Sequence, residues 1–190
     1  MSAKDLIIIL PHPHLRGRSK KVAMFTDEVR RVIKDMKAAT LDWEASRPHE
    51  VGVALAAIQI DQFYRIIIIR NDFDNKDDKT FVVFINPEIV KREGVVQEDY
   101  EGCLSVKDIY GKVPRHSKIR MKALDEQGRE VRVRAEGFLA RVIQHEIDHL
   151  KGKLFVDGLE DNAEAFYKLA ADGKLTHLDY EEVQKAGIFR

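Results

Sequence analysis

The feature that most constrains this chain is a helix that must be buried although it carries two histidines and a glutamate. Residues 137–150 (GFLARVIQHEIDHL) place apolar side chains around most of the helix circumference, which predicts a buried helix rather than an amphipathic surface helix. Burying imidazole and carboxylate groups costs free energy unless they are paired or bind a metal ion. The fold must therefore build a polar or metal-binding site around this helix.

The spacing of these polar residues favours a metal site. His145 and His149 are four residues apart and lie on one face of a helix, so both rings can reach the same ion. Glu146 lies beside them, where a carboxylate can move protons. The alternative is a helix that carries two histidines without any shared role. The free energy needed to bury them unpaired makes this alternative the weaker one.

A catalytic metal site needs a third protein ligand and one open position. One class of zinc proteases carries a third histidine six residues after the second, but Phe155 stands there and has no ligand atom. Another class uses a downstream glutamate. Glu160 and Glu164 are present, but they lack the asparagine-glutamate context of that class. The single cysteine of the chain, Cys103, remains as the candidate ligand, and a Cys-His-His set leaves a fourth position for water.

Cys103 lies in the segment Glu101–Ser105 (EGCLS), directly after a stretch typical of a strand. Gly102 allows the backbone to pass close to a ligand. A lone cysteine is more often a small core residue, but the two histidines favour the interpretation as a metal ligand. One cysteine also excludes a disulfide framework and is typical of a reducing compartment.

Composition indicates an ordinary globular protein. The chain has 190 residues, of which 44% are hydrophobic and 34% charged, which suits one domain with its own core. Lys+Arg and Asp+Glu both number 32, and this balance argues against a general nucleic-acid-binding surface. The apolar run Leu6–Leu10 is too short for a signal peptide or a membrane span. We therefore expect a cytoplasmic protein with no membrane partner.

Strand and helix patterns are segregated along the chain, which favours an α+β fold of one domain, with mixed or antiparallel sheets packed around the buried helix. Helical spacing predicts a helix over residues 26–45, started by Thr26 or Asp27, and a third helix over 161–171, ended by Gly173. Strands are predicted at 66–69, 81–85 (ending at Asn86-Pro87), 95–96, 119–124 and 130–135, with a hairpin turn at 125–128.

Two segments are predicted to lie at the surface. Residues 71–80 are polar and charged, which is typical of a loop. The end of the chain is polar with a few apolar residues, so we assign residues 1–172 to the domain and residues 173–190 to a C-terminal tail.

Three segments taken together resemble the peptide deformylase family. In chain order they are Gly52–Gln59 (GVALAAIQ), Glu101–Ser105 (EGCLS) and Gln144–His149 (QHEIDH). The interval between Cys103 and His145 also resembles the spacing in that family. The resemblance extends over roughly residues 5–160, and three ordered motifs are more specific than any one of them.

The resemblance implies a metal-dependent amide hydrolase that removes the formyl group from the N-terminal methionine of nascent polypeptides and releases formate. It acts on this linear amide and not on peptide bonds. Glu146 would move the protons of the reaction. The Gln59 side chain and the Leu104 backbone N–H would stabilise the tetrahedral oxyanion.

The resemblance also implies the metal ligands, which would be Cys103, His145 and His149 around one divalent ion. The ligand types by themselves suit zinc. The family implies ferrous iron as the working metal, with nickel, cobalt or zinc as alternatives. An iron form should lose activity in air as the metal or the thiolate oxidises.

By motif position, the candidates for substrate binding are Val53, Ala54, Phe138 and Val142, although simple core packing would explain the apolar ones equally well. The family usually has glycine where this chain has Ala54, at a position where the backbone runs beside the substrate. The extra methyl group could be silent, could narrow the cleft or could change the substrate preference.

The expected partners are formyl-methionyl nascent peptides, with transient ribosome contact left open because the mixed charge of the tail favours a solvated terminus. An ion pair between Glu101 and Arg115 is expected to steady the Cys103 segment. Asp148 is expected to orient an imidazole or to bind a basic neighbour. Two other functions stay open: a zinc endopeptidase of another lineage, and a homologue that binds formylated N-termini without turnover.

Overall fold

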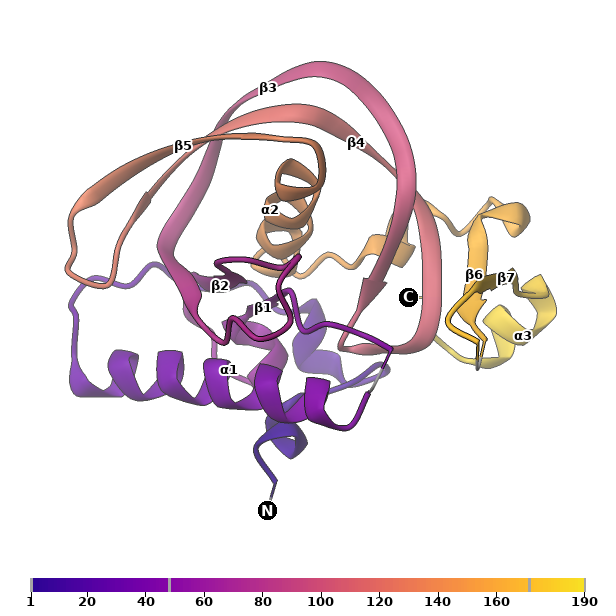
Figure 1. Ribbon diagram of the computed structural model, residues 1–190, viewed down its shortest axis with the longest axis horizontal. Helices are drawn as coiled ribbons and strands as arrows, with labels where there is room; N and C mark the ends of the chain where they lie inside the picture. Colours follow the sequence, from indigo (N-terminus) through magenta and orange to yellow (C-terminus); the bar gives the residue numbers. More distant parts are fainter. Residues whose placement is uncertain (1, 48, 171, 190) are drawn as a thin grey trace.

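The computed structural model in Figure 1 describes residues 2–47, 49–170 and 172–189. Within these residues the α-helices are α1 (Asp27–Ala45), α2 (Gly137–His149) and α3 (Tyr180–Lys185). The strands are β1 (Ala54–Ala56), β2 (Ile66–Arg70), β3 (Phe81–Cys103), β4 (Val106–Leu124), β5 (Glu130–Glu136), β6 (Phe166–Leu169) and β7 (Leu175–His177). Short 3-10 helices are found at Ala3–Leu6, Pro13–Arg16, Ala57–Ile60, Phe155–Gly158 and Ala163–Ala165.

The described strands form one antiparallel sheet in the order β1-β2-β3-β4-β6-β7, with β5 also paired to β4. Strands β3 and β4 are long and curved, and in Figure 1 they arch over α2. Helix α1 lies on the far side of β1 and β2 from α2. The α+β fold with a central helix, predicted from the sequence, is therefore confirmed.

Strand β2 separates two hydrophobic cores. Its four isoleucines are almost fully buried and alternate in direction, as expected for a strand covered on both faces. Ile67 and Ile69 pack with α2, whereas Ile66 and Ile68 pack with α1. Burying such a side chain contributes about 1.5–3 kcal/mol, so this short strand fixes the positions of both helices.

A third core lies between the start of β4 and the C-terminal part of the chain. Its buried members include Val106 of β4, Phe155, Phe166 of β6 and Val183 of α3. Cys103 is partly buried against this cluster. The assignment of residues 173–190 to a separate tail stays a prediction, but several apolar side chains of that segment pack into this core.

The prediction of a third helix over residues 161–171 is wrong. Only a 3-10 turn at Ala163–Ala165 forms, and the chain then enters β6. Phe166 pairs with Gly111 of β4 and is fully buried, and this tertiary contact outweighs the local helical preference. Gly173, at φ 80°, serves the β6–β7 turn instead of ending a helix. Ala171 lies outside the described residues.

Strand β3 does not end at Asn86-Pro87 as predicted, and the short strand expected at 95–96 is part of it. A shift in register between Ile85 and Glu88 takes up the proline, which has no N–H to donate. The side chain of Asn86 also exchanges two hydrogen bonds with the Val22 backbone, at 2.9 and 2.8 Å. The helix predicted at 26–45, with Thr26 as its N-cap, and the 125–128 turn are confirmed.

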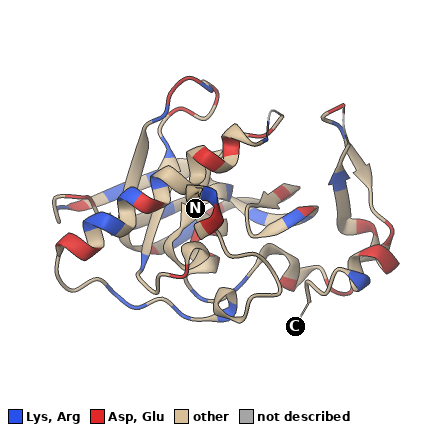
Figure 2. Cartoon of the chain, turned by 90° about the horizontal axis from the view of Figure 1, so that it is seen from below, with Lys and Arg blue, Asp and Glu red and all other residues tan. Residues whose placement is uncertain are grey.

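Acidic and basic residues are interspersed along α1 and the strands (Figure 2), in line with the zero net charge. Among the helices of the described residues, none is long and apolar enough to cross a membrane.

A buried ion pair joins α1 to the strand region that leads to the site. The Glu44 carboxylate accepts hydrogen bonds from the Arg70 guanidinium, the Gly52 backbone N–H (2.9 Å) and Lys79 (2.9 Å). Arg70 is 1% exposed and also donates to the Gly52 and Asp78 carbonyls. Burial raises the pKa of Glu44, but the hydrogen bonds from Lys79 and Gly52 and the charge of Arg70 outweigh it and lower the pKa.

We predict that Glu44→Gln lowers the free energy of unfolding at pH 7 by about 3 kcal/mol, because it leaves the Arg70 charge buried without its counter-ion. The folded pKa of Glu44 lies below the usual 4.5, so its ionic contribution is present above that pH and is lost as the pH falls further. Urea unfolding should therefore show the difference from wild type shrinking at acidic pH.

The matched control is Glu130→Gln, which removes an exposed carboxylate and should change the free energy of unfolding by no more than about 0.5 kcal/mol. Equal effects of the two substitutions would contradict the assigned role of the buried pair. So would a difference in free energy of unfolding between Glu44→Gln and wild type that does not depend on pH.

Candidate metal centre and active site

Three ligand atoms from two distant parts of the chain lie close together: two from histidines of α2 and one from the cysteine at the end of β3. The Nε2 atoms of His145 and His149 are 3.2 Å apart, and the His149 Nε2 is 3.3 Å from the Cys103 Sγ. All the ligand atoms of this trio lie within 4.8 Å of one another, and within the described ranges it is the sole such group of histidine, cysteine or acidic side chains. The two histidines face one point because they are one helical turn apart.

Cys103 is placed by the tight turn between β3 and β4. It pairs with Val106, and the turn residues Leu104 and Ser105 lie between them. Ser105 is fully buried, and its carbonyl accepts a hydrogen bond from the Leu10 N–H at 2.9 Å. The N-terminal segment thus supports the turn from behind and fixes the direction of the cysteine side chain.

Gln59 is held beside the cysteine with a defined orientation of its amide. Its Oε1 accepts from the Ala56 N–H at 2.8 Å, which leaves Nε2 to face the site. That nitrogen donates to the Ser105 Oγ at 3.1 Å and to the Cys103 Sγ at 3.4 Å. The Leu104 N–H has no hydrogen-bond partner among the described residues. Two donors, the Gln59 Nε2 and the Leu104 N–H, therefore lie next to the ligand trio.

The Glu101 carboxylate orients one of the imidazoles. It accepts from the His145 Nδ1 at 2.9 Å, from Arg115 at 2.9 and 3.0 Å, and from Arg141 at 2.8 Å. Burial raises the pKa of Glu101, but the hydrogen bonds from His145 and Arg115 bring it down to about 2. With Nδ1 committed to the carboxylate, the His145 Nε2 is the atom left to face the other ligands.

The ion pair predicted between Glu101 and Arg115 is present, and Arg115 also binds Asp148. Of the two alternatives for Asp148, the basic neighbour is the one that the structure shows. Sequence reasoning missed Arg141, which donates to the Val113 and Gln97 carbonyls, each at 2.7 Å, besides Glu101. The sequence of α2 does contain a pattern that could have identified Arg141.

That pattern is the helical spacing, because Arg141 stands four residues before His145 and eight before His149 on the same helix face. An arginine in an otherwise apolar helix has to find acceptors when it is buried. It finds them on β3 and β4, and so clamps the arch of these strands onto α2.

Glu146 is buried and its Oε2 has no hydrogen-bond partner within the described part of the chain. Burial and the nearby charge of Glu101 raise the pKa of Glu146 to about 7, against the opposing charge of His145. An unpaired buried carboxyl is unfavourable unless a water or a ligand meets it. With a pKa near neutrality it can both accept and donate a proton.

The donor set fits a divalent metal ion. Two imidazole nitrogens and a thiol sulfur pointing at one another cannot all be satisfied by hydrogen bonds among themselves. Burial, with the charge of His145, lowers the pKa of His149 well below its usual value, which keeps this ring neutral as a metal ligand requires. Thiolate and imidazole ligands suit iron, zinc, nickel or cobalt rather than magnesium or calcium.

A cavity of about 420 Å³ lies beside the ligand trio. Its lining contains Cys103 and His145 and all four side chains predicted for substrate binding: Val53, Ala54, Phe138 and Val142. Ala54 is not among the described residues with positive φ, so alanine in place of the usual glycine causes no backbone strain.

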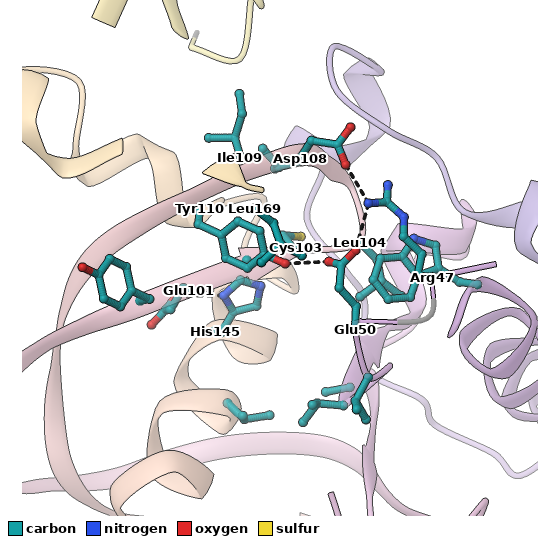
Figure 3. A pocket seen from close by; sticks show the side chains of 18 of the residues that line it. Arg47, Glu50, Glu101, Cys103, Leu104, Asp108, Ile109, Tyr110, His145 and Leu169 are labelled. Carbon is teal, nitrogen blue, oxygen red and sulfur yellow. Dashed lines mark hydrogen bonds and ion pairs between the residues drawn. The ribbon is translucent and has the colours of Figure 1, made fainter. Parts of the chain in front are cut away.

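The rim of the cavity is charged and aromatic. In Figure 3 the Tyr110 hydroxyl donates to Glu50, and Arg47 bridges Glu50 and Asp108. Phe138 is 48% exposed and its ring meets the ring of Phe73 from the 71–80 loop at 5.1 Å. The segment predicted to be a plain surface loop therefore reaches the edge of the site.

Comparisons with known proteins agree with this geometry. The family model for polypeptide deformylase matches residues 4–165. The peptide deformylase of Thermomicrobium roseum is 42% identical over 164 residues, covering 85% of this chain and 89% of that protein. The peptide deformylase 1 of Pseudomonas syringae is 42% identical over 156 residues, covering 82% and 86%.

Solved structures give the same result. A peptide deformylase from Synechococcus elongatus in complex with actinonin has a TM-score of 0.74 and 35% identity, covering 82% of this chain and 80% of that one. The structure from Plasmodium falciparum has a TM-score of 0.72 and 31% identity, covering 95% and 91%. On sequence, fold and site geometry, the chain belongs to the peptide deformylase family.

Proposed function

We propose that this chain is a metal-dependent deformylase that hydrolyses the N-formyl group of formyl-methionine at the start of nascent polypeptides and releases formate. The single observation that carries the proposal is the convergence of Cys103, His145 and His149 beside the unpaired carboxyl of Glu146. Family membership supports the same reaction. A formyl amide is small enough to reach the ligand trio at the bottom of a lined cavity.

Cys103, His145 and His149 would hold one divalent ion, and Glu101 would keep His145 in the orientation that a ligand needs. When bound, the ion would supply Lewis-acid chemistry, polarising the formyl carbonyl and lowering the pKa of water. The hydrogen bonds from His145 and Arg115 keep the Glu101 carboxylate ionised, so it does not compete for the protons of the reaction.

Glu146 would take a proton from the attacking water and deliver it to the leaving amine nitrogen. Burial raises the pKa of its carboxyl above the usual value, which suits a group that has to accept and return a proton. The Gln59 Nε2 and the Leu104 N–H would donate hydrogen bonds to the oxyanion of the tetrahedral intermediate. Both groups are held before substrate arrives, Gln59 by the Ala56 N–H and Leu104 by the β3–β4 turn.

The substrate backbone would lie along β1, whose outer edge is the end of the described sheet. A peptide can add there as a further strand, with its main chain near Ala54. The methionine side chain would then enter the apolar part of the cavity beside Val53, Phe138 and Val142. The exposed half of Phe138 gives that side chain a surface to cover.

Iron is the proposed metal. The proposed compartment is the cytoplasm, where reducing conditions would preserve both ferrous iron and the Cys103 thiolate. The proposed partners are formyl-methionyl nascent chains, which would be met in transient contact with the ribosome. In this proposal residues 1–172 carry the reaction and residues 173–190 follow as a C-terminal extension.

The first test of the proposed function is formate release: protein purified anaerobically and loaded with iron should release formate from formyl-Met-Ala-Ser. Glu146→Gln should keep one metal ion per chain but lower kcat by about 10²–10⁴, because the proton carrier is lost. Cys103→Ala should lose both the metal and the turnover. Formate release and the metal content of each variant are measured together.

Glu160→Gln is the matched control for the carboxylate, since Glu160 is exposed and should leave turnover unchanged. Near-normal turnover in Glu146→Gln would refute the assignment of the proton carrier. No formate from the metal-loaded wild type would refute the deformylase proposal as a whole.

The second test concerns the metal. Protein loaded with ferrous iron should lose most of its formate release after exposure to air, because the ion or the thiolate oxidises, whereas protein loaded with nickel should keep its activity. The measurement is activity against time in air, with the iron content and the Cys103 oxidation state followed by mass spectrometry. Equal activity of aerobically and anaerobically purified protein would exclude iron as the working metal.

A further inference from the structure

The β6–β7 hairpin (Phe166–His177) lies beyond residues 4–165, the part of the chain that matches the family model, and yet it lines the active-site cavity. Leu169, Gly173 and Leu175 share that cavity with Cys103 and His145. Figure 3 draws Leu169 and Tyr110 among the side chains that line the cavity. The site therefore has a wall from a segment that its motifs do not include.

The hairpin has one apolar face and one polar face. Leu169 pairs with Leu175 across the two strands, and both side chains are half-buried. Lys168 pairs with Thr176 on the opposite face, and both are exposed to solvent. Because alternate residues of a strand point to opposite faces, the leucine pair is directed at the cavity while the polar pair faces water.

The base of the hairpin is fixed, which makes the leucine face a preformed surface. Phe166 is fully buried in the third core and pairs with Gly111 of β4. The Tyr167 ring meets the Tyr100 ring of β3 at 4.8 Å, and the Lys112 ammonium lies over both rings at 5.8 and 5.5 Å. A ligand would thus bind this face without first having to order it.

The position of the hairpin relative to Cys103 shows which part of a substrate reaches it. Tyr110 of β4 pairs with Gly102 on one side and with Tyr167 of β6 on the other. Two strand spacings of about 4.8 Å place β6 about 10 Å from the strand that carries Cys103. An extended peptide rises about 3.3 Å per residue, so its third residue lies at that distance from the reacting group.

We propose that the leucine face of the β6–β7 hairpin binds the side chain of the third substrate residue, counting formyl-methionine as the first, and selects apolar residues there. The inference rests on the proposed deformylase function and names a specificity determinant of the same site. Leu169 and Leu175 are binding residues in this scheme and take no part in the chemical step.

The test uses the full-length, metal-loaded protein and four substrates: formyl-Met-Ala amide, and formyl-Met-Ala-Xaa amides with leucine, serine or glutamate as the third residue. Wild type should prefer leucine to serine at the third position by about tenfold in kcat/KM, mostly through KM. The double variant Leu169→Thr/Leu175→Thr should lower that ratio to about one to two. Its kcat/KM for formyl-Met-Ala amide, which ends before the hairpin, should stay within about twofold of wild type.

Lys168→Thr is the matched control on the solvent face and should keep the wild-type ratio. Leu169→Lys supplies a gain of preference, since it should favour formyl-Met-Ala-Glu amide over the leucine peptide, a result that loss of folding cannot produce.

Formate release from formyl-Met-Ala amide without discrimination at the third position would overturn the inference and leave the deformylase proposal intact. Discrimination that survives the double variant would also overturn it. No release from any peptide would overturn the deformylase proposal, and this inference with it.

Discussion

The hydrogen bonds that meet at the Glu101 carboxylate are the interaction on which the rest of the site depends. Its partners come from β4 (Arg115) and from two turns of α2 (Arg141 and His145), while Glu101 itself belongs to β3. One buried charge thus joins the arch of long strands to the helix beneath it. Its pKa of about 2 means that this junction stays ionised over the whole neutral range.

This arrangement explains how a helix so apolar can hold so many polar groups. Each buried group on the helix face of Arg141, His145 and His149 meets a partner or a site of opposite character. Two atoms of this helix are exceptions, the Glu146 Oε2 and the His149 Nδ1, which are left without a partner among the described residues. An unpaired buried carboxyl such as that of Glu146 is unfavourable until water or substrate meets it, which is typical of a reactive group.

Much of this could be predicted because the signals are local. The 3.6-residue period gives α1 and α2, and the run of isoleucines gives β2 with its two buried faces. The metal trio could be proposed from residue types and helical spacing, and the structure brings the three ligand atoms together. Such patterns are visible in the sequence because the spacing of apolar residues reflects which side chains are buried.

The features that local patterns do not predict depend on contacts between segments far apart in the sequence. The local pattern around Phe166 predicts a helix, but its pairing with Gly111 and its burial in the third core favour a strand. No local pattern reveals that partner. The same long-range pairing carries the β6–β7 hairpin to the cavity that the family motifs build. The cleft thus joins a shared chemical centre to a wall added by the C-terminal segment, and such a wall can vary without disturbing Glu101 or the metal ligands.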